Sequence, residues 1–147
     1  MLIKDIMTSN PAVVLPADSV RDAARLMALH GVGLLPIVES HIYRRLLGVI
    51  TDRDLIVRCV AEHRSLDEPV AEFMTPMPIA STDPLSDVSA AVEVMRENDL
   101  RRLPVLDEDE IVLGVVSRVD VERTFESSRD EADGAGFVGL KPTHVLS

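Results

Sequence analysis

The chain has 147 residues, of which 46% are hydrophobic, enough for the core of one compact domain or of two closely joined halves. Its 15 basic residues against 25 acidic ones give a formal net charge of −10, which argues against binding to duplex nucleic acid or to an anionic membrane surface. A single cysteine, Cys59, excludes an internal disulfide, and every apolar run is too short to span a bilayer. We therefore expect a soluble, cytoplasmic protein.

The same short segments occur twice along the chain, at an offset of 66 to 68 residues. An internal repeat indicates that one supersecondary unit is used twice and cannot bury its apolar face alone. Any site built by one copy then has a pseudo-symmetric partner in the other. The matching segments are Met7-Thr8 and Met74-Thr75, 35–38 and 103–106, and 48–54 and 114–120.

Each copy predicts the same order of elements. A Met-Thr turn and a short extended run precede an amphipathic helix, and two apolar strands and a second helix follow. This order predicts an α/β fold of the α+β type, with a βαββα unit given twice. The extended runs are 12–15 and 79–80, the strands are 34–38, 46–50, 103–106 and 112–116, and the second helices begin after Thr51 and Ser117. The apolar stripe of the first of these helices consists of Leu55, Ile56, Cys59 and Val60.

Changes in composition divide the chain into four parts. We expect a first repeat over residues 1–62, a polar linker over 63–72 and a second repeat over 73–126. Residues 127–147 mix Ser, Asp, Glu, Gly and Pro without periodicity, which predicts a flexible tail.

The junction between the last strand and the second helix carries the most informative chemistry in each copy. Thr51 with Asp54, and Ser117 with Asp120, place a hydroxyl and a carboxylate around the free amides of a helix N-terminus. Such an N-terminus with a hydroxyl favours a phosphate, and an acceptor-only carboxylate suits the two hydroxyls of a ribose. The same spacing is also that of a capping box, which explains both residues without any ligand. Both interpretations remain open at this point.

Basic residues distinguish the two copies. Arg101 and Arg102 begin a strand of the second copy, where guanidinium groups can close on a phosphate, although a solvated strand end explains them as well. The first copy has Gly33-Leu34 at that place and carries Arg53 in its junction instead. If ligands bind, the two sites should therefore differ in affinity.

The ordered set of motifs resembles the CBS domain, the regulatory module named after cystathionine β-synthase, over roughly residues 2–125. The resemblance is to small bacterial proteins made of little more than one CBS pair. It implies two βαββα units with pseudo-two-fold symmetry, a cleft that binds AMP, ADP, ATP or S-adenosylmethionine, and a homodimer formed through helices. The positions that the resemblance carries over are Asp54 and Asp120 for the ribose, and Thr51, Arg53, Arg101, Arg102 and Ser117 for the phosphate.

These observations favour a non-enzymatic sensor that passes a signal through its dimer or to a partner protein. The alternative is a ligand-free structural or interaction module that forms homodimers. An enzyme is disfavoured because the four histidines are scattered without metal-ligand spacing, and the sequence has neither a Gly-x-Ser-x-Gly elbow nor a Walker phosphate loop. We expect no catalytic residue and no metal site.

Overall fold

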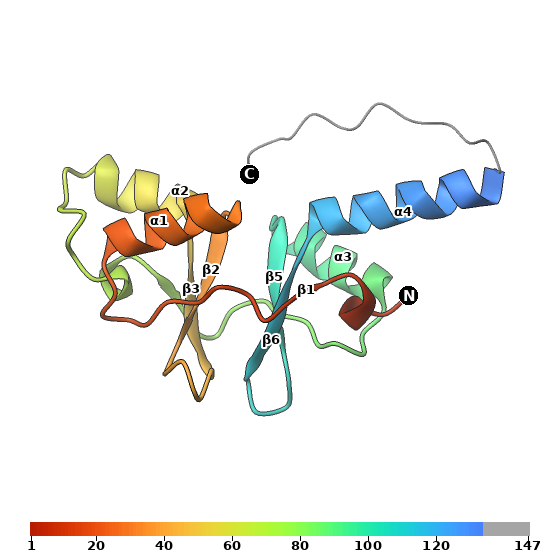
Figure 1. Cartoon of the computed structure of the whole chain (residues 1–147), viewed down its shortest axis with the longest axis horizontal. Coiled ribbons are helices and arrows are strands. Elements are labelled where there is room, and N and C mark those ends of the chain that lie inside the picture. The colour runs from red at the N-terminus through yellow and green to blue at the C-terminus, as the bar shows by residue number, and fades with distance from the viewer. Residues whose placement is uncertain (134–147) are drawn as a thin grey trace.

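The computed structural model describes the backbone of residues 1–133 and the side chains of residues 1–126. Two halves stand side by side, each with the predicted order of strand, helix, strand, strand and helix, which confirms the fold class (Figure 1). In chain order, the first repeat contributes β1 (Thr8–Ser9), α1 (Val20–His30), β2 (Leu34–Val38), β3 (Leu46–Thr51) and α2 (Asp52–Asp54), which continues as the π-helix η2 (Leu55–Val60). The second repeat contributes β4 (Thr75–Pro76), α3 (Val88–Glu97), β5 (Arg102–Leu106), β6 (Val112–Ser117) and α4 (Arg118–Asp133). Short 3-10 turns, η1 (Ile3–Asp5) and η3 (Val70–Glu72), precede β1 and β4.

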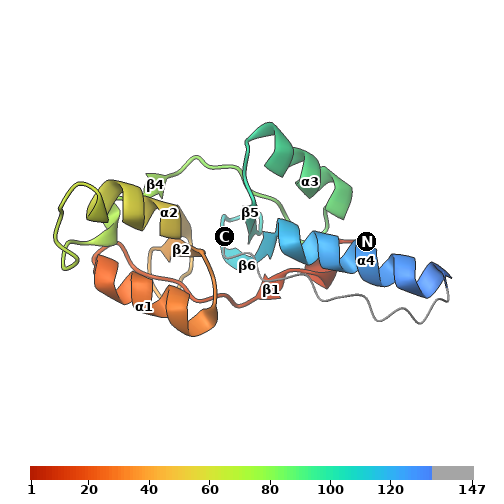
Figure 2. The same ribbon diagram turned by 90° about the horizontal axis from the view of Figure 1, so that it is seen from above.

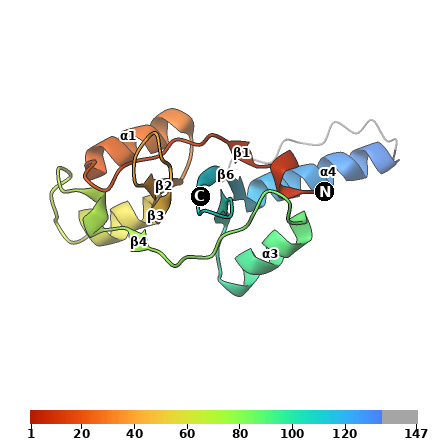
Figure 3. The same ribbon diagram turned by 90° about the horizontal axis from the view of Figure 1, so that it is seen from below.

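The two Met-Thr segments differ from the prediction, because they form short strands that pair with the sheet of the other copy. β1 runs antiparallel to β6 with Thr8 opposite Val115, and β4 runs antiparallel to β3 with Thr75 opposite Val49. The two three-stranded sheets therefore have the orders β1-β6-β5 and β2-β3-β4. Figures 2 and 3 show the two connecting segments crossing between the halves on opposite sides.

This strand exchange explains the glycine of each repeat. A Cβ atom at Gly48 would lie 2.5 Å from the carbonyl oxygen of Thr75, and a Cβ atom at Gly114 would lie 2.7 Å from that of Thr8. Glycine in a strand often marks such a close approach of another backbone. The approaching backbone belongs in each case to the opposite copy.

The predicted extended runs form only isolated bridges. Val14 pairs in parallel with Ile37, and the corresponding bridge in the second half joins Thr82 to Val105. The second of these lies just beyond the predicted run at 79–80, because the chain there still serves as the crossing connection from β4.

Buried side chains form a core in each half and a third cluster between them. Ile3 from the N-terminal turn completes the core of the second half, whereas Val70 from the linker and Phe73 directly after it complete the core of the first. The halves are thus held together by packing as well as by strand pairing. The third cluster contains Val13, Val38 and Leu46 from the first copy with Leu106 and Val112 from the second.

The second helix of the first copy buries only half of its predicted apolar stripe. Leu55 and Cys59 face the core, but Ile56 and Val60 are 61% and 55% exposed. The segment is a π-helix, in which the amide of Ala61 donates to the carbonyl of Ile56 at 2.8 Å. Its wider turn divides a stripe that was predicted from α-helical spacing. An exposed apolar face of Ile56, Val57 and Val60 results.

The last described element, α4, continues to Asp133, beyond the predicted end of the second repeat at residue 126. The remainder of the predicted tail, residues 134–147, lies outside the described residues. Among the described helices, none combines the length and the hydropathy that a membrane crossing requires.

Candidate functional site

The first junction lies where β3 ends at Thr51 and α2 begins. Thr51 Oγ1 accepts a hydrogen bond from the amide of Asp54 at 3.1 Å, and Asp54 Oδ2 accepts one from the amide of Thr51 at 2.9 Å. This reciprocal pair is a capping box, which satisfies two amides at the helix start.

The second junction, between β6 and α4, has the same local geometry. Ser117 Oγ accepts from the amide of Asp120 at 3.1 Å, and Asp120 Oδ2 accepts from the amide of Ser117 at 3.3 Å. The capping interpretation is therefore observed in both copies. Each aspartate commits one carboxylate oxygen to its own main chain, and the ribose contact of Asp54 and Asp120 stays a prediction that depends on the other oxygen.

The two remaining oxygens are in different situations. Asp54 Oδ1 forms an ion pair with Arg58 Nε at 3.6 Å, and the Asp54 side chain is only 15% exposed. Asp120 Oδ1 makes no hydrogen bond or ion pair with the side chains described by the structure, and Asp120 is half-buried. The second junction thus presents the more available acceptor.

Arg102 lies beside the second junction. The register of β5 and β6 places Arg102 directly opposite Ser117, so the half-buried side chain of Arg102 starts from the residue that faces the junction. The corresponding register of β2 and β3 places Leu34 opposite Thr51. Arg101 is exposed, and its carbonyl accepts a hydrogen bond from the amide of Arg118 at 2.7 Å. The structure therefore brings together Arg101, Arg102, Ser117 and Asp120.

Electrostatics connects the two junctions. Burial lowers the pKa of Arg102, the charge of Arg101 lowers it further, and the negative charge of Asp52 at the start of α2 raises it. A guanidinium that has lost part of its hydration stays charged, and a nearby anion stabilises that charge. Because Asp52 acts on Arg102, the first turn of α2 lies near the arginine pair of the other copy.

The phosphate contact of Arg53 stays a prediction. Its side chain is exposed and makes no hydrogen bond or ion pair with the described residues, and its amide donates to Asp52 Oδ1 at 2.8 Å. Its proposed contact with phosphate therefore rests on the resemblance alone.

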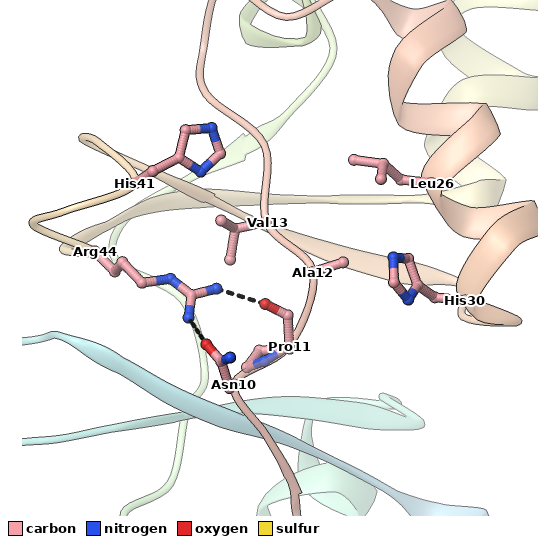
Figure 4. Close-up of a pocket in the computed structure, with 8 residues that line it drawn as sticks. All are labelled: Asn10, Pro11, Ala12, Val13, Leu26, His30, His41 and Arg44. Carbon is pink, nitrogen blue, oxygen red and sulfur yellow. Dashed lines mark hydrogen bonds between the residues drawn. The ribbon is translucent and has the colours of Figure 1, made fainter.

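A separate hollow of about 430 Å³ lies on the crossing segment of the first copy, between α1 and the β2–β3 hairpin (Figure 4). Two histidines line it from opposite sides, His30 on α1 and His41 on the β2–β3 hairpin (Figure 4). None of the seven predicted site residues lines this hollow. Its lining consists of Asn10, Pro11, Ala12, Val13, Leu26, His30, His41 and Arg44.

Arg44 has a structural role that the sequence did not indicate. Its guanidinium donates to the side chain of Asn10 and, at 2.5 Å, to the carbonyl of Pro11 (Figure 4). Its own carbonyl accepts from the amide of Val112 at 2.9 Å. Arg44 therefore connects the β2–β3 hairpin by hydrogen bonds to the crossing segment and to β6 of the second copy.

Comparison with known proteins identifies the repeat. The family model described as the CBS domain matches residues 3–60 and again residues 70–126. The chain belongs to the CBS domain family. The resemblance drawn from the motifs is thereby confirmed, together with the tandem arrangement.

Relatives of this chain include one protein known from its sequence and two solved CBS pairs. The CBS domain-containing protein YhcV of Bacillus subtilis (strain 168) is 36% identical over 143 residues, which cover 97% of each chain. The CBS domain pair of protein MJ0100, solved with 5′-methylthioadenosine and S-adenosyl-L-methionine, is 27% identical with a TM-score of 0.77 over 87% of this chain and 98% of that one. CBSX2 of Arabidopsis thaliana, solved with AMP, is 28% identical with a TM-score of 0.73 over the same shares.

Two further observations complete the description of the CBS pair. Arg58 was not singled out from the sequence, although its position four residues after Asp54 on a helix is the usual spacing of an ion pair. In the described part of the chain, no three His, Cys, Asp or Glu side chains are grouped so as to hold a metal ion.

Proposed function

We propose that the protein is a regulatory module that binds an adenosine-containing ligand, namely AMP, ADP, ATP or S-adenosylmethionine. The ligand lies in the cleft between the two repeats that membership of the CBS family implies. The observation that carries this proposal is the constellation of Arg102, Ser117 and Asp120, in which a partly dehydrated cation, a helix N-terminus and an available carboxylate oxygen lie together.

Each of these groups matches one part of a nucleotide. Asp120 Oδ1 accepts hydrogen bonds from the ribose hydroxyls, while Oδ2 keeps its bond to the amide of Ser117. Arg102 and Arg101 neutralise the phosphate or carboxylate charge, because guanidinium forms charge-assisted hydrogen bonds with such oxyanions. The base packs against aliphatic side chains, since the chain has no Trp, one Tyr and three Phe.

Two structural neighbours support the choice of ligand. The MJ0100 pair holds 5′-methylthioadenosine and S-adenosyl-L-methionine, and CBSX2 holds AMP. All three ligands contain adenosine, and they differ in what is attached to its 5′ carbon. A shared adenosine site with a variable outer part therefore fits these relatives, and it leaves the arginine pair to select among the attached groups.

Thermal unfolding with and without each ligand tests this function. Because only the folded state binds, a ligand at 100 times its dissociation constant adds about 2.7 kcal/mol to the free energy of unfolding. For a domain of this size that gain raises Tm by about 5–10 °C. Guanosine monophosphate and inorganic phosphate serve as controls for the base and for the charge. If AMP, ADP, ATP and S-adenosylmethionine at saturating concentration all leave Tm unchanged, the proposal is wrong.

The proposal places the protein in the cytoplasm, as a homodimer without catalytic activity. A ligand regulates such a dimer only if it binds one arrangement of helices or subunits more tightly than another. A partner protein that reads the dimer would then receive the signal.

A ligand-free structural module that forms homodimers is the second candidate function, and the exposed face of Ile56, Val57 and Val60 supports the dimer that both candidates share. Large apolar side chains that cluster on an exposed helix mark an interface with another protein. We expect the wild-type chain to sediment as a dimer and the Ile56→Glu variant to sediment as a monomer. Leu85→Glu is the matched control, since Leu85 is 67% exposed but lies outside this face. Equal sedimentation of all three proteins would contradict the assignment of this face.

A further inference from the structure

The carboxylates of Asp54 and Asp120 differ in how many of their oxygens already have a partner within the protein. Asp54 accepts from the amide of Thr51 at 2.9 Å through Oδ2 and pairs with Arg58 at 3.6 Å through Oδ1. Asp120 accepts from the amide of Ser117 through Oδ2 only, within the side chains that the structure describes. A ribose diol that approaches Asp54 therefore competes with a cation for the remaining oxygen, whereas no ion pair among the described side chains involves Asp120 Oδ1.

Arg58 is held in this position from two sides. Besides its ion pair with Asp54, its guanidinium donates a hydrogen bond to the carbonyl of Phe73 at 3.2 Å. Phe73 is buried at the end of the linker turn, so this anchor is fixed by the core of the first half. The position that corresponds to Arg58 in the second copy is Thr124, whose hydroxyl donates to the backbone carbonyl of Asp120 at 2.9 Å. Thr124 thus leaves the carboxylate of Asp120 untouched.

The surrounding charges act in the same direction. The strand residue opposite the junction hydroxyl is Leu34 in the first copy and Arg102 in the second. The first helical residue is Asp52 in the first copy and Arg118 in the second. At these two positions the first junction has an aliphatic side chain and a carboxylate, and the second has two arginines, of which Arg118 also pairs with Glu122 at 3.7 Å. The exposed cation of the first junction is Arg53, where the second copy has Val119.

We propose that Arg58 holds the first junction closed to a ribose by occupying the carboxylate of Asp54, so that the second junction is the single high-affinity site of each chain. This inference rests on the proposed function and specifies its stoichiometry. Arg58 is a specificity-determining residue that acts through Asp54, and the asymmetry between the repeats is built into the chain.

Calorimetric titration with AMP, and in parallel with ATP and S-adenosylmethionine, tests the inference on the chain of residues 1–147. The informative variant is Arg58→Met, which keeps an unbranched apolar side chain of similar reach and removes the charge. Thr124→Ala is the matched control at the corresponding position of the other repeat. Arg58→Met combined with Asp54→Asn reports whether any gained site uses Asp54. Melting curves without ligand establish that each variant is folded.

We expect one site per wild-type chain, and in Arg58→Met a second site whose affinity is at least about tenfold higher than any second site of the wild type. The double variant should lose that gain, and Thr124→Ala should bind as the wild type does. Two equal sites in the wild type, or a second site unaffected by Arg58→Met, would overturn the inference and leave the proposed function standing. An absence of binding to all three ligands in every folded variant would overturn both.

Discussion

The Asp120→Asn variant should bind adenosine ligands roughly 10- to 150-fold more weakly than the wild type, because a hydrogen bond to a charged acceptor contributes about 1.5–3 kcal/mol. Asparagine keeps one carbonyl oxygen, which can still accept from the amide of Ser117. It replaces the other acceptor, Oδ1, by a donor that cannot bind a ribose hydroxyl as the carboxylate does. The loss of affinity should therefore occur while the helix cap is preserved.

Titration calorimetry with AMP measures this effect, and a melting curve without ligand checks that Asp120→Asn retains the stability of the wild type. The matched control is Asp54→Asn, which makes the same chemical change at the other capping box. Since Arg58 already occupies Asp54, this second variant should change the affinity less than about threefold. An Asp120→Asn protein with undiminished affinity would show that the ribose assignment is wrong.

The Gly48→Ala variant should lose about 3 kcal/mol of unfolding free energy, at the upper end of the usual cost of overpacking. The added Cβ would lie 2.5 Å from the carbonyl oxygen of Thr75, a backbone atom held by the pairing of β4 with β3. Relief therefore requires the exchanged strand to move away. For a protein of this length the loss corresponds to a decrease in Tm of about 6–12 °C, measured by circular dichroism.

Gly31→Ala is the control for this experiment, because it makes the same substitution where an added Cβ has no neighbour within 4 Å. Its φ of +63° is unfavourable for alanine, so we expect a cost of about 1 kcal/mol from backbone strain alone. If Gly48→Ala costs no more than Gly31→Ala, the close approach of β4 does not limit the residue at position 48.

The internal repeat made the fold predictable, because each element could be assigned from two copies of the same pattern. Apolar runs at 34–38 and 112–116 became strands, and both second helices begin directly after Thr51 and Ser117. The destination of the Met-Thr segments could not be predicted in this way. A two-residue strand has no periodicity of its own, and the choice between pairing with its own sheet or the opposite one depends on the path of the connection.

The sequence suggested which residues to consider for the candidate site. It could not show whether their side chains cap a helix or are available to a ligand. The spacing of Thr51 with Asp54 is common to a capping box and to a nucleotide site, so no local pattern separates the two. The structure shows that the cap uses one carboxylate oxygen, which leaves room for both roles in the second copy. The position of Arg102 beside Ser117 depends on strand register, and the anchoring of Arg58 on Phe73 depends on packing between distant segments.

The reciprocal pairing of β1 and β4 restricts how the two halves can move. Opening them like a hinge would strip an edge strand from both sheets at once and break the Leu46 and Val112 hydrogen bonds between the hairpins. Because each sheet takes its edge strand from the other repeat, a single repeat expressed by itself would lack that strand and leave an open sheet edge.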